Sequence, residues 1–180
     1  MRKIRMRYFA QATLVCTALI IAPATVRSAD QSPAPSAPTI QKRSITSEAA
    51  LAIAQIALKA GREKGNEVAV AVVDQAGILL VLLRSDYGTE QFVEGATDKA
   101  WTAINFKAST REVFETIKNN KEDNSQLPFA RKSLFLMGGV PLKDGDAIVG
   151  AVGVAGFESG MADDEVAQKA AHAFTELLKK

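Results

Sequence analysis

A glycine-rich run from Met137 to Gly156 constrains the fold more than any other part of this sequence. Asp144-Gly145 lies between two apolar runs, and this pair favours a tight turn because Asp tolerates a positive φ and Gly adopts one freely. The run therefore predicts a β-hairpin. Its second strand carries Gly150, Gly153 and Gly156, and glycine weakens a strand unless a ligand or another backbone must come close. We expect a packed helix, a partner subunit or a ligand beside this strand.

The first 29 residues have the pattern of a secretory signal peptide. Four basic residues precede an apolar segment from Tyr8 to Ala22, and Ala22-Pro23-Ala24 offers a cleavage pattern, with Val26-Arg27-Ser28 as a competing site. The apolar segment is shorter than the roughly 20 residues that a membrane-spanning helix needs. We therefore expect cleavage, no membrane anchor after processing, and a periplasmic or secreted protein.

Removal of residues 1–29 changes the charge and the cysteine content. The whole chain has 22 basic and 20 acidic residues, but the signal holds five basic and no acidic ones, so the mature chain has 17 and 20. No basic patch remains that would indicate a nucleic-acid partner. The single cysteine, Cys16, also lies in the signal, which excludes disulfides, thiolate metal sites and a cysteine nucleophile from the mature chain. Export without disulfides suits a bacterial periplasm.

The rest of the chain divides into a linker and one domain. Residues 30–44 are rich in Pro, Ser and Ala and predict a flexible linker, and residues 45–180 are long enough to bury a core. Periodicity predicts an α+β fold, with an antiparallel sheet covered by helices. The expected helices lie at 46–64, 90–107, 109–118 and 163–179. The expected strands lie at 68–73 and 78–83, as a hairpin buried on both faces, and in the glycine-rich run; residues 119–131 predict a mobile loop.

Four motifs in this order carry a family resemblance. They are Val68-Ala69-Val70-Ala71-Val72-Val73-Asp74-Gln75-Ala76-Gly77, Thr97-Asp98-Lys99-Ala100, the glycine-rich run, and Asp163-Asp164-Glu165-Val166-Ala167. Over residues 45–178 the chain resembles the GlcG/HbpS family of small haem-binding, also called haem-degrading, domains, which are related to the C-terminal domain of PduO-type cobalamin adenosyltransferases. The resemblance implies a profilin-like fold and haem as the cofactor. It also implies a homo-oligomer built by packing the alanine-rich helices at 90–107 and 163–179.

Several polar residues and glycines are candidates for contacts with the cofactor. Asp98 and Lys99 match the family's D-K-A segment, although a solvated lysine and an ordinary helix carboxylate explain them equally well. Arg84 could pair a propionate in a bidentate way or form a surface ion pair. Asp74 is expected to form an Asx turn. The full candidate set for cofactor binding is Arg84, Asp98, Lys99, Gly138, Gly139, Gly153 and Gly156.

His172 is the only histidine, so any histidine ligation of haem iron by this chain depends on it. A structural or solvent-facing role is the alternative. Some relatives bind haem through a histidine between the first helix and the first strand, but Lys64-Gly65-Asn66-Glu67 contains none. Tyr87, Met137 and Met161 are other possible axial groups. The acids at 163–165 could hold a hard cation, although capping of the last helix explains them too.

Two functions from different classes follow. The first is an exported protein that binds haem or another tetrapyrrole for sequestration, delivery or sensing. The second is an enzyme that acts on a small carboxylate or hydroxy acid of glycolate-type metabolism, with Lys99 or Asp98 as general acid or base. A ligand-free oligomeric accessory protein is a third, plainer possibility. The scarcity of His and Cys weakens the enzyme hypothesis.

Overall fold

The structure, a computed structural model, describes residues 40–120 and 132–179. The predicted signal peptide, residues 30–39 of the linker and residues 121–131 of the predicted loop lie outside this part. Among the helices of the described residues, none combines the length and the apolar character needed to cross a membrane.

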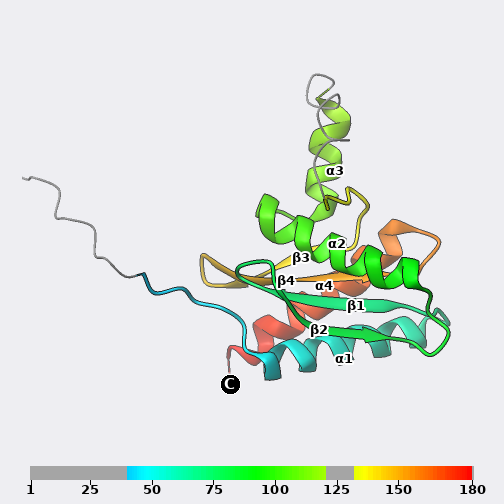
Figure 1. Cartoon of the computed structure of the whole chain (residues 1–180), viewed down its shortest axis with the longest axis horizontal. Coiled ribbons are helices and arrows are strands. Elements are labelled where there is room, and N and C mark those ends of the chain that lie inside the picture. The colour runs from blue at the N-terminus through cyan, green and yellow to red at the C-terminus, as the bar shows by residue number, and fades with distance from the viewer. Residues whose placement is uncertain (1–39, 121–131, 180) are drawn as a thin grey trace, which may run out of the picture. The chain divides into compact units, whose positions relative to one another are not determined.

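The described residues form one antiparallel sheet and four helices, which confirms the predicted α+β class (Figure 1). The strands lie in the order β2-β1-β4-β3, so the two hairpins meet through the antiparallel pair of β1 and β4. The elements are α1 (Ser47–Glu63), β1 (Ala69–Asp74), β2 (Leu79–Arg84), α2 (Glu90–Phe106), α3 (Thr110–Asn119), β3 (Gly139–Asp144), β4 (Ala147–Ala155) and α4 (Gly160–Leu177).

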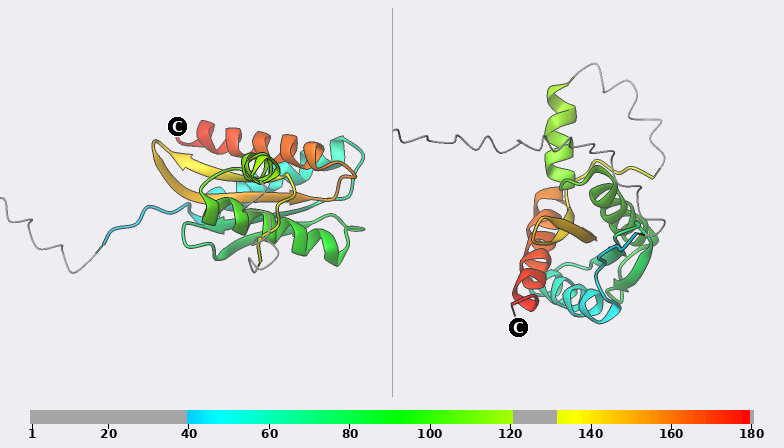
Figure 2. Two further views of the ribbon diagram at one scale, coloured as in Figure 1. Left: turned by 90° about the horizontal axis from the view of Figure 1, so that it is seen from above. Right: turned by 90° about the vertical axis from the view of Figure 1, so that its left-hand side faces the viewer.

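Helices cover both faces of the sheet (Figure 2). α2 packs on one face, against β1 and β4, and α1 and α4 pack side by side on the other. Because strand side chains alternate between faces, β1 divides its residues between two cores. Ala69, Ala71 and Val73 lie in the core under α2, whereas Val70 and Val72 lie in the larger core under α1 and α4. α3 projects away from the sheet.

Local signals in the sequence produce the predicted turns and helix starts. Thr46 caps α1 by accepting a hydrogen bond from the Ala49 amide. Ser109 and Glu112 form a complete capping box at α3. Asp74 accepts hydrogen bonds from two amides of the following loop, which confirms the Asx turn. Gly145 has a φ of +61° in the β3–β4 turn, which confirms the hairpin, but the turn residues are Gly145 and Asp146 because Asp144 ends β3 and pairs with Ala147.

The strand glycines allow α2 to lie directly on the sheet. A Cβ on Gly153 would be 2.0 Å from the Ala96 carbonyl oxygen, and one on Gly139 would be 2.2 Å from the Lys99 carbonyl oxygen. Backbone atoms of α2 therefore fill the space beside both glycines. The packed-helix alternative explains these two positions, and it removes the room in which they could contact a ligand.

Three expectations from the sequence are wrong. β2 is not buried on both faces, because it lies at the edge of the sheet while α2 covers β1 and β4. Helical spacing predicts Phe106 on the inward face of the helix at 90–107, but its side chain is exposed and packs edge-to-face on Phe135. α4 begins at Gly160 rather than at Asp163, which places the acidic residues inside the helix.

Candidate functional site

A buried ion pair joins the middle of α2 to the first turn of α4. Lys99 Nζ lies 2.7 Å from Asp163 Oδ2 and donates a second hydrogen bond, of 3.0 Å, to the Val154 carbonyl oxygen. The two side chains are only 3% and 5% exposed. The Phe157 amide donates to the other carboxylate oxygen of Asp163 at 3.2 Å. The pair therefore connects α2, β4 and α4 at one point.

Glycine makes room for this pair. A Cβ on Gly138 would lie 3.1 Å from Lys99 Nζ and 2.8 Å from the Cβ of Asp163, and the φ of Gly138 is +122°. Burial raises the pKa of the Asp163 carboxyl above its ordinary value, and the attraction of Lys99 offsets only part of this effect. For the Asp163 carboxyl, removal from water is thus the larger effect.

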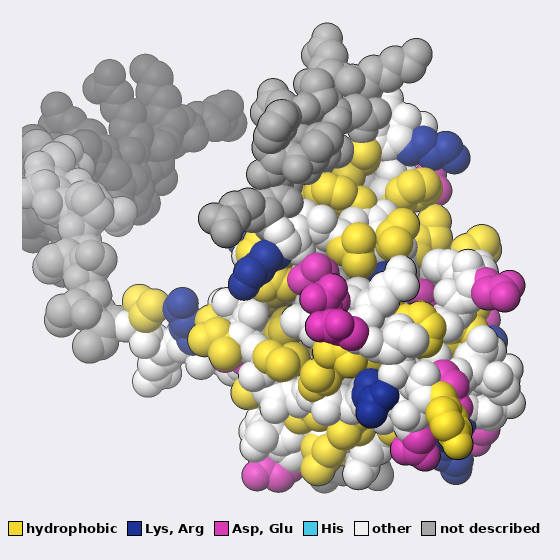
Figure 3. Space-filling view, turned by 45° about the vertical axis from the view of Figure 1, so that its right-hand side comes forward, with side chains coloured by type: hydrophobic (Ala, Val, Ile, Leu, Met, Phe, Trp, Pro, Cys, Tyr) yellow, Lys and Arg dark blue, Asp and Glu magenta, His cyan; other side chains and the backbone are white. Residues whose placement is uncertain are grey.

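A cavity of about 320 Å³ opens beside the ion pair. α2, the segment before β3 and the connection from β4 to α4 enclose it. Its walls combine apolar and aromatic side chains with a few acidic groups, and the face drawn in Figure 3 likewise shows hydrophobic side chains around a group of acidic ones. The lining consists of Gln91, Phe92, Glu94, Gly95, Asp98, Lys99, Leu134, Leu136, Ala155, Gly156, Phe157 and Asp163. Small-molecule sites typically have this mixture of apolar walls and few polar groups.

Asp98 lies at this cavity, one residue before the buried lysine. Burial raises the pKa of the Asp98 carboxyl, and the charge of Lys132 opposes the rise without cancelling it. Thr102, one turn further along α2, accepts a hydrogen bond of 2.8 Å from the Leu134 amide and so holds the apolar wall in place. The cavity thus has a fixed wall and a carboxylate without a close cationic partner among the described residues.

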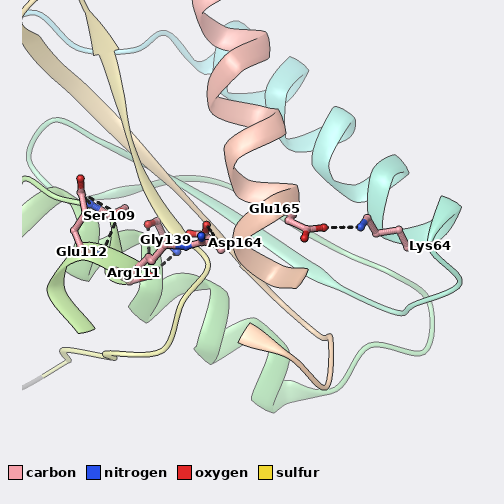
Figure 4. Close-up of polar contacts among 8 residues, drawn as sticks. Lys64, Ser109, Arg111, Glu112, Gly139, Asp164 and Glu165 are labelled. Atoms are coloured by element: carbon pink, nitrogen blue, oxygen red, sulfur yellow. Dashed lines mark hydrogen bonds and ion pairs between the residues drawn. The ribbon is translucent and has the colours of Figure 1, made fainter. Parts of the chain in front are cut away.

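Three consecutive acidic residues of α4 each pair with a cation from a different part of the chain. Asp163 pairs with Lys99 of α2. Figure 4 shows the other two pairs, Asp164 with Arg111 of α3 at 2.7 Å and Glu165 with Lys64, the residue after α1, at 2.8 Å. Neither capping nor a metal site describes this arrangement. Within residues 40–120 and 132–179, no group of three or more His, Cys, Asp and Glu side chains is arranged to hold a metal ion.

The structure brings together only some of the candidate residues. Asp98, Lys99 and Gly156 line the cavity, and Gly138 adjoins the lysine. Gly139 and Gly153 pack against α2 instead. Arg84 does not line the cavity; its guanidinium group donates to the carbonyl oxygens of Asp86 and Gly88.

His172 also lies away from this cavity. Its side chain is 76% exposed on α4 and lies 3.8 Å from Glu176. It borders a different, more polar depression of about 370 Å³ between the α2–α3 turn, β3 and α4. The solvent-facing alternative therefore describes its surroundings.

Sequence reasoning missed Asp163 as the partner of Lys99, and it missed the aromatic and leucine walls. One signal was available in the sequence. A lysine in an alanine-rich, covered helix needs an acidic partner, and the acidic residues 163–165 were candidates for that partner. Glu67, at the end of the Lys64–Glu67 segment, lies against Gly156 of the cavity lining. A Cβ on Gly156 would be 2.3 Å from the Glu67 carbonyl oxygen.

Comparisons with known proteins agree with this architecture. Residues 45–172 match the family model described as haem degrading protein HbpS-like. A comparison with curated proteins finds no match. A double mutant of HbpS from Streptomyces reticuli is 35% identical, with a TM-score of 0.71, and the match covers 78% of this chain and 93% of that one.

Two further solved structures have the same fold. The ORFY protein of Klebsiella pneumoniae, assigned to DUF336, is 28% identical over 77% of this chain and 96% of that one, with a TM-score of 0.71. A PduOC:heme complex is 24% identical over 72% of this chain and 94% of that one, with a TM-score of 0.66. The family match covers most of the domain that the structure describes. The chain therefore belongs to the HbpS-like family of haem-degrading proteins.

Proposed function

We propose that this protein binds haem or a related tetrapyrrole in the cavity beside Lys99 and Asp163. The observation that carries the proposal is this cavity, whose walls include Phe92, Phe157 and two leucines above a buried ion pair. The family description and the relative solved as a haem complex support the same ligand class. A flat porphyrin gains affinity mainly by burying its apolar faces, which is what such walls provide.

The cavity fits part of a tetrapyrrole rather than all of it. A volume of about 320 Å³ lies near the lower end of the range for small-molecule sites, about 300–1,000 Å³. The polar side chains of the described lining are three carboxylates, one lysine and the amide of Gln91, with no His, Cys, Met or Tyr. The described lining therefore offers none of the usual protein ligands of haem iron, and the proposal rests on burial of the porphyrin faces.

A spectroscopic titration tests this proposal. Haemin added to the mature protein should produce a Soret band and saturate at one site per chain with low micromolar affinity or better, about −8 kcal/mol. His172→Ala and Tyr87→Phe should leave the Soret maximum unchanged, because both side chains are exposed outside the cavity. A broad spectrum like that of free haemin would contradict the proposal.

The enzyme hypothesis gains no support from the cavity. A small carboxylate substrate needs a cation to bind it, and Lys99, the single cation in the described lining, is already paired. We therefore propose a binding role in sequestration, delivery or sensing of haem rather than chemistry on a carboxylate.

We further propose that the protein acts after export to the periplasm. The support is the signal pattern of residues 1–29. N-terminal sequencing of the exported form should give a first residue between Thr25 and Asp30. Recovery of the intact Met1 chain from the membrane fraction would contradict export with cleavage.

We also propose a homo-oligomer, with β2 rather than the outer faces of α2 and α4 as the contact. β2 is an edge strand whose Leu79, Leu80 and Leu82 are all at least 37% exposed. The opposite edge, β3, is protected. Pro141 has no amide hydrogen there, and the Gly139 amide already donates to Thr110 Oγ1.

The occupant that suits an unprotected apolar edge is the same edge of a second copy, related by a two-fold axis. Sedimentation analysis should show that Leu82→Lys reduces the oligomer, whereas Leu51→Lys, on α1, does not. These two leucines have similar exposure, 37% and 42%. An unchanged oligomer in Leu82→Lys would contradict β2 as the contact.

A further inference from the structure

The charges around the cavity are unbalanced. Its lining contains three carboxylates, from Glu94, Asp98 and Asp163, and one cation, Lys99. The ammonium group of Lys99 is held by Asp163 and the Val154 carbonyl oxygen, and its side chain is almost wholly buried. The charge of Lys99 is therefore neutralised inside the protein, and the cavity presents negative charge to a ligand.

Among the described residues, neither Arg84 nor Lys132 belongs to the lining. The Arg84 guanidinium group is committed to two backbone carbonyl oxygens after β2. Lys132 acts on the Asp98 carboxyl, yet burial still raises the pKa of Asp98. A ligand carboxylate placed in the cavity would lose water and lie beside the carboxyl groups of Glu94 and Asp98, both of which disfavour its ionised form.

The remaining walls suit the uncharged edge of a planar ligand. Phe92 and Phe157 offer aromatic surface, and Leu134 and Leu136 offer aliphatic surface from the segment before β3. Leu136 is 57% exposed, so a bound ligand would cover apolar surface that now faces water. Burial of such surface favours binding at about 25 cal/mol per Å².

From this arrangement we propose that the cavity selects against carboxylates and takes the uncharged edge of its ligand. For haem, the methyl- and vinyl-bearing edge enters and both propionates stay in solvent. This inference rests on the proposed function, and it is opposite to the expectation that Lys99 or Arg84 pairs a propionate.

The test compares haemin with haemin dimethyl ester, which has the same macrocycle and no carboxylates, in one detergent-containing buffer that keeps both monomeric. The proposal predicts dissociation constants within about threefold of each other, because the propionates make no contact. A dimethyl ester that binds at least tenfold more weakly than haemin would overturn it. If neither compound binds, the proposed function itself is wrong, and this inference is overturned with it.

Asp98→Asn gives a second, independent readout. The proposal predicts that this variant binds haemin at least twofold more tightly, because the ligand no longer has to cover a carboxylate. Asp146→Asn is the matched control, since Asp146 lies in the β3–β4 turn at the opposite end of β4 from the cavity, and its affinity should equal that of the wild type. A tenfold loss of affinity in Asp98→Asn alone would show that the carboxylate holds the ligand and would contradict the proposal.

Discussion

Lys99 and Asp163 form a 2.7 Å ion pair that is almost completely shielded from solvent, although 64 residues separate them in the sequence. The pair fixes α2 to the start of α4 across the end of β4. Buried ion pairs often add little net stability, because the desolvation of both charges offsets their attraction. Loss of one partner is costly, however, because it leaves an uncompensated charge in the interior.

Lys99→Met should therefore destabilise the fold by about 3–5 kcal/mol, because it leaves the buried Asp163 carboxyl without its cationic partner. The double variant Lys99→Met, Asp163→Asn should recover much of this loss, because the Asn oxygen can still accept the hydrogen bond from the Phe157 amide. Urea denaturation of the two variants and the wild type measures both effects. Equal losses in the single and double variants would show that packing, not charge, dominates at this site.

Gly153→Val should destabilise the domain by about 1–3 kcal/mol or more through overpacking. The physical reason is the Ala96 carbonyl oxygen, which lies 2.0 Å from where a Cβ would be and belongs to the backbone of α2. Gly160→Ala is the matched control, because a Cβ there would make only ordinary contacts, the nearest at 3.5 Å. Thermal unfolding that gives the same midpoint for both variants would contradict the close approach of α2.

Asp164→Asn should change the pH dependence of stability. Burial raises the pKa of Asp164 above its ordinary value of 3.8 despite the Arg111 partner, so the folded state binds this proton more readily than the unfolded state. Asp164 is therefore most favourable to folding at acid pH, and its contribution falls as the pH rises through the raised pKa. The stability of the wild type relative to Asp164→Asn should thus decline as the pH rises above the ordinary carboxyl pKa of 3.8. Denaturation curves in which this difference rises with pH would contradict the burial effect.

Signals that act over a few residues were readable from the sequence. The Thr46 cap, the capping box of Ser109 and Glu112, the Asx turn of Asp74 and the Asp-Gly hairpin all use partners within four residues. The glycines of β4 also indicated a close neighbour. Their spacing could not tell a helix from a ligand, because both need the same missing Cβ.

Features that depend on residues far apart in the sequence could not be predicted in the same way. The β2 sequence is as apolar as that of β1, so its place at the sheet edge depends on the strand order and not on its own composition. The partner of Lys99 comes from a different helix, and its acidic neighbours resembled an ordinary helix start. Asp98, Lys99 and Gly156 were found through the family resemblance, whereas the aromatic and leucine walls of the cavity carried no motif.

The measurement that tests the central claim most directly is a haemin titration of the wild type, Leu136→Asp and Leu51→Asp. Both leucines are partly exposed, so neither substitution should unfold the domain, but only Leu136 lines the cavity. If haem binds beside Lys99 and Asp163, Leu136→Asp should weaken binding at least tenfold, about 1.4 kcal/mol, because it adds a further carboxylate to an apolar wall. Leu51→Asp should stay within threefold of the wild type. Equal haemin affinity in all three proteins would contradict the claim that this cavity is the haem site.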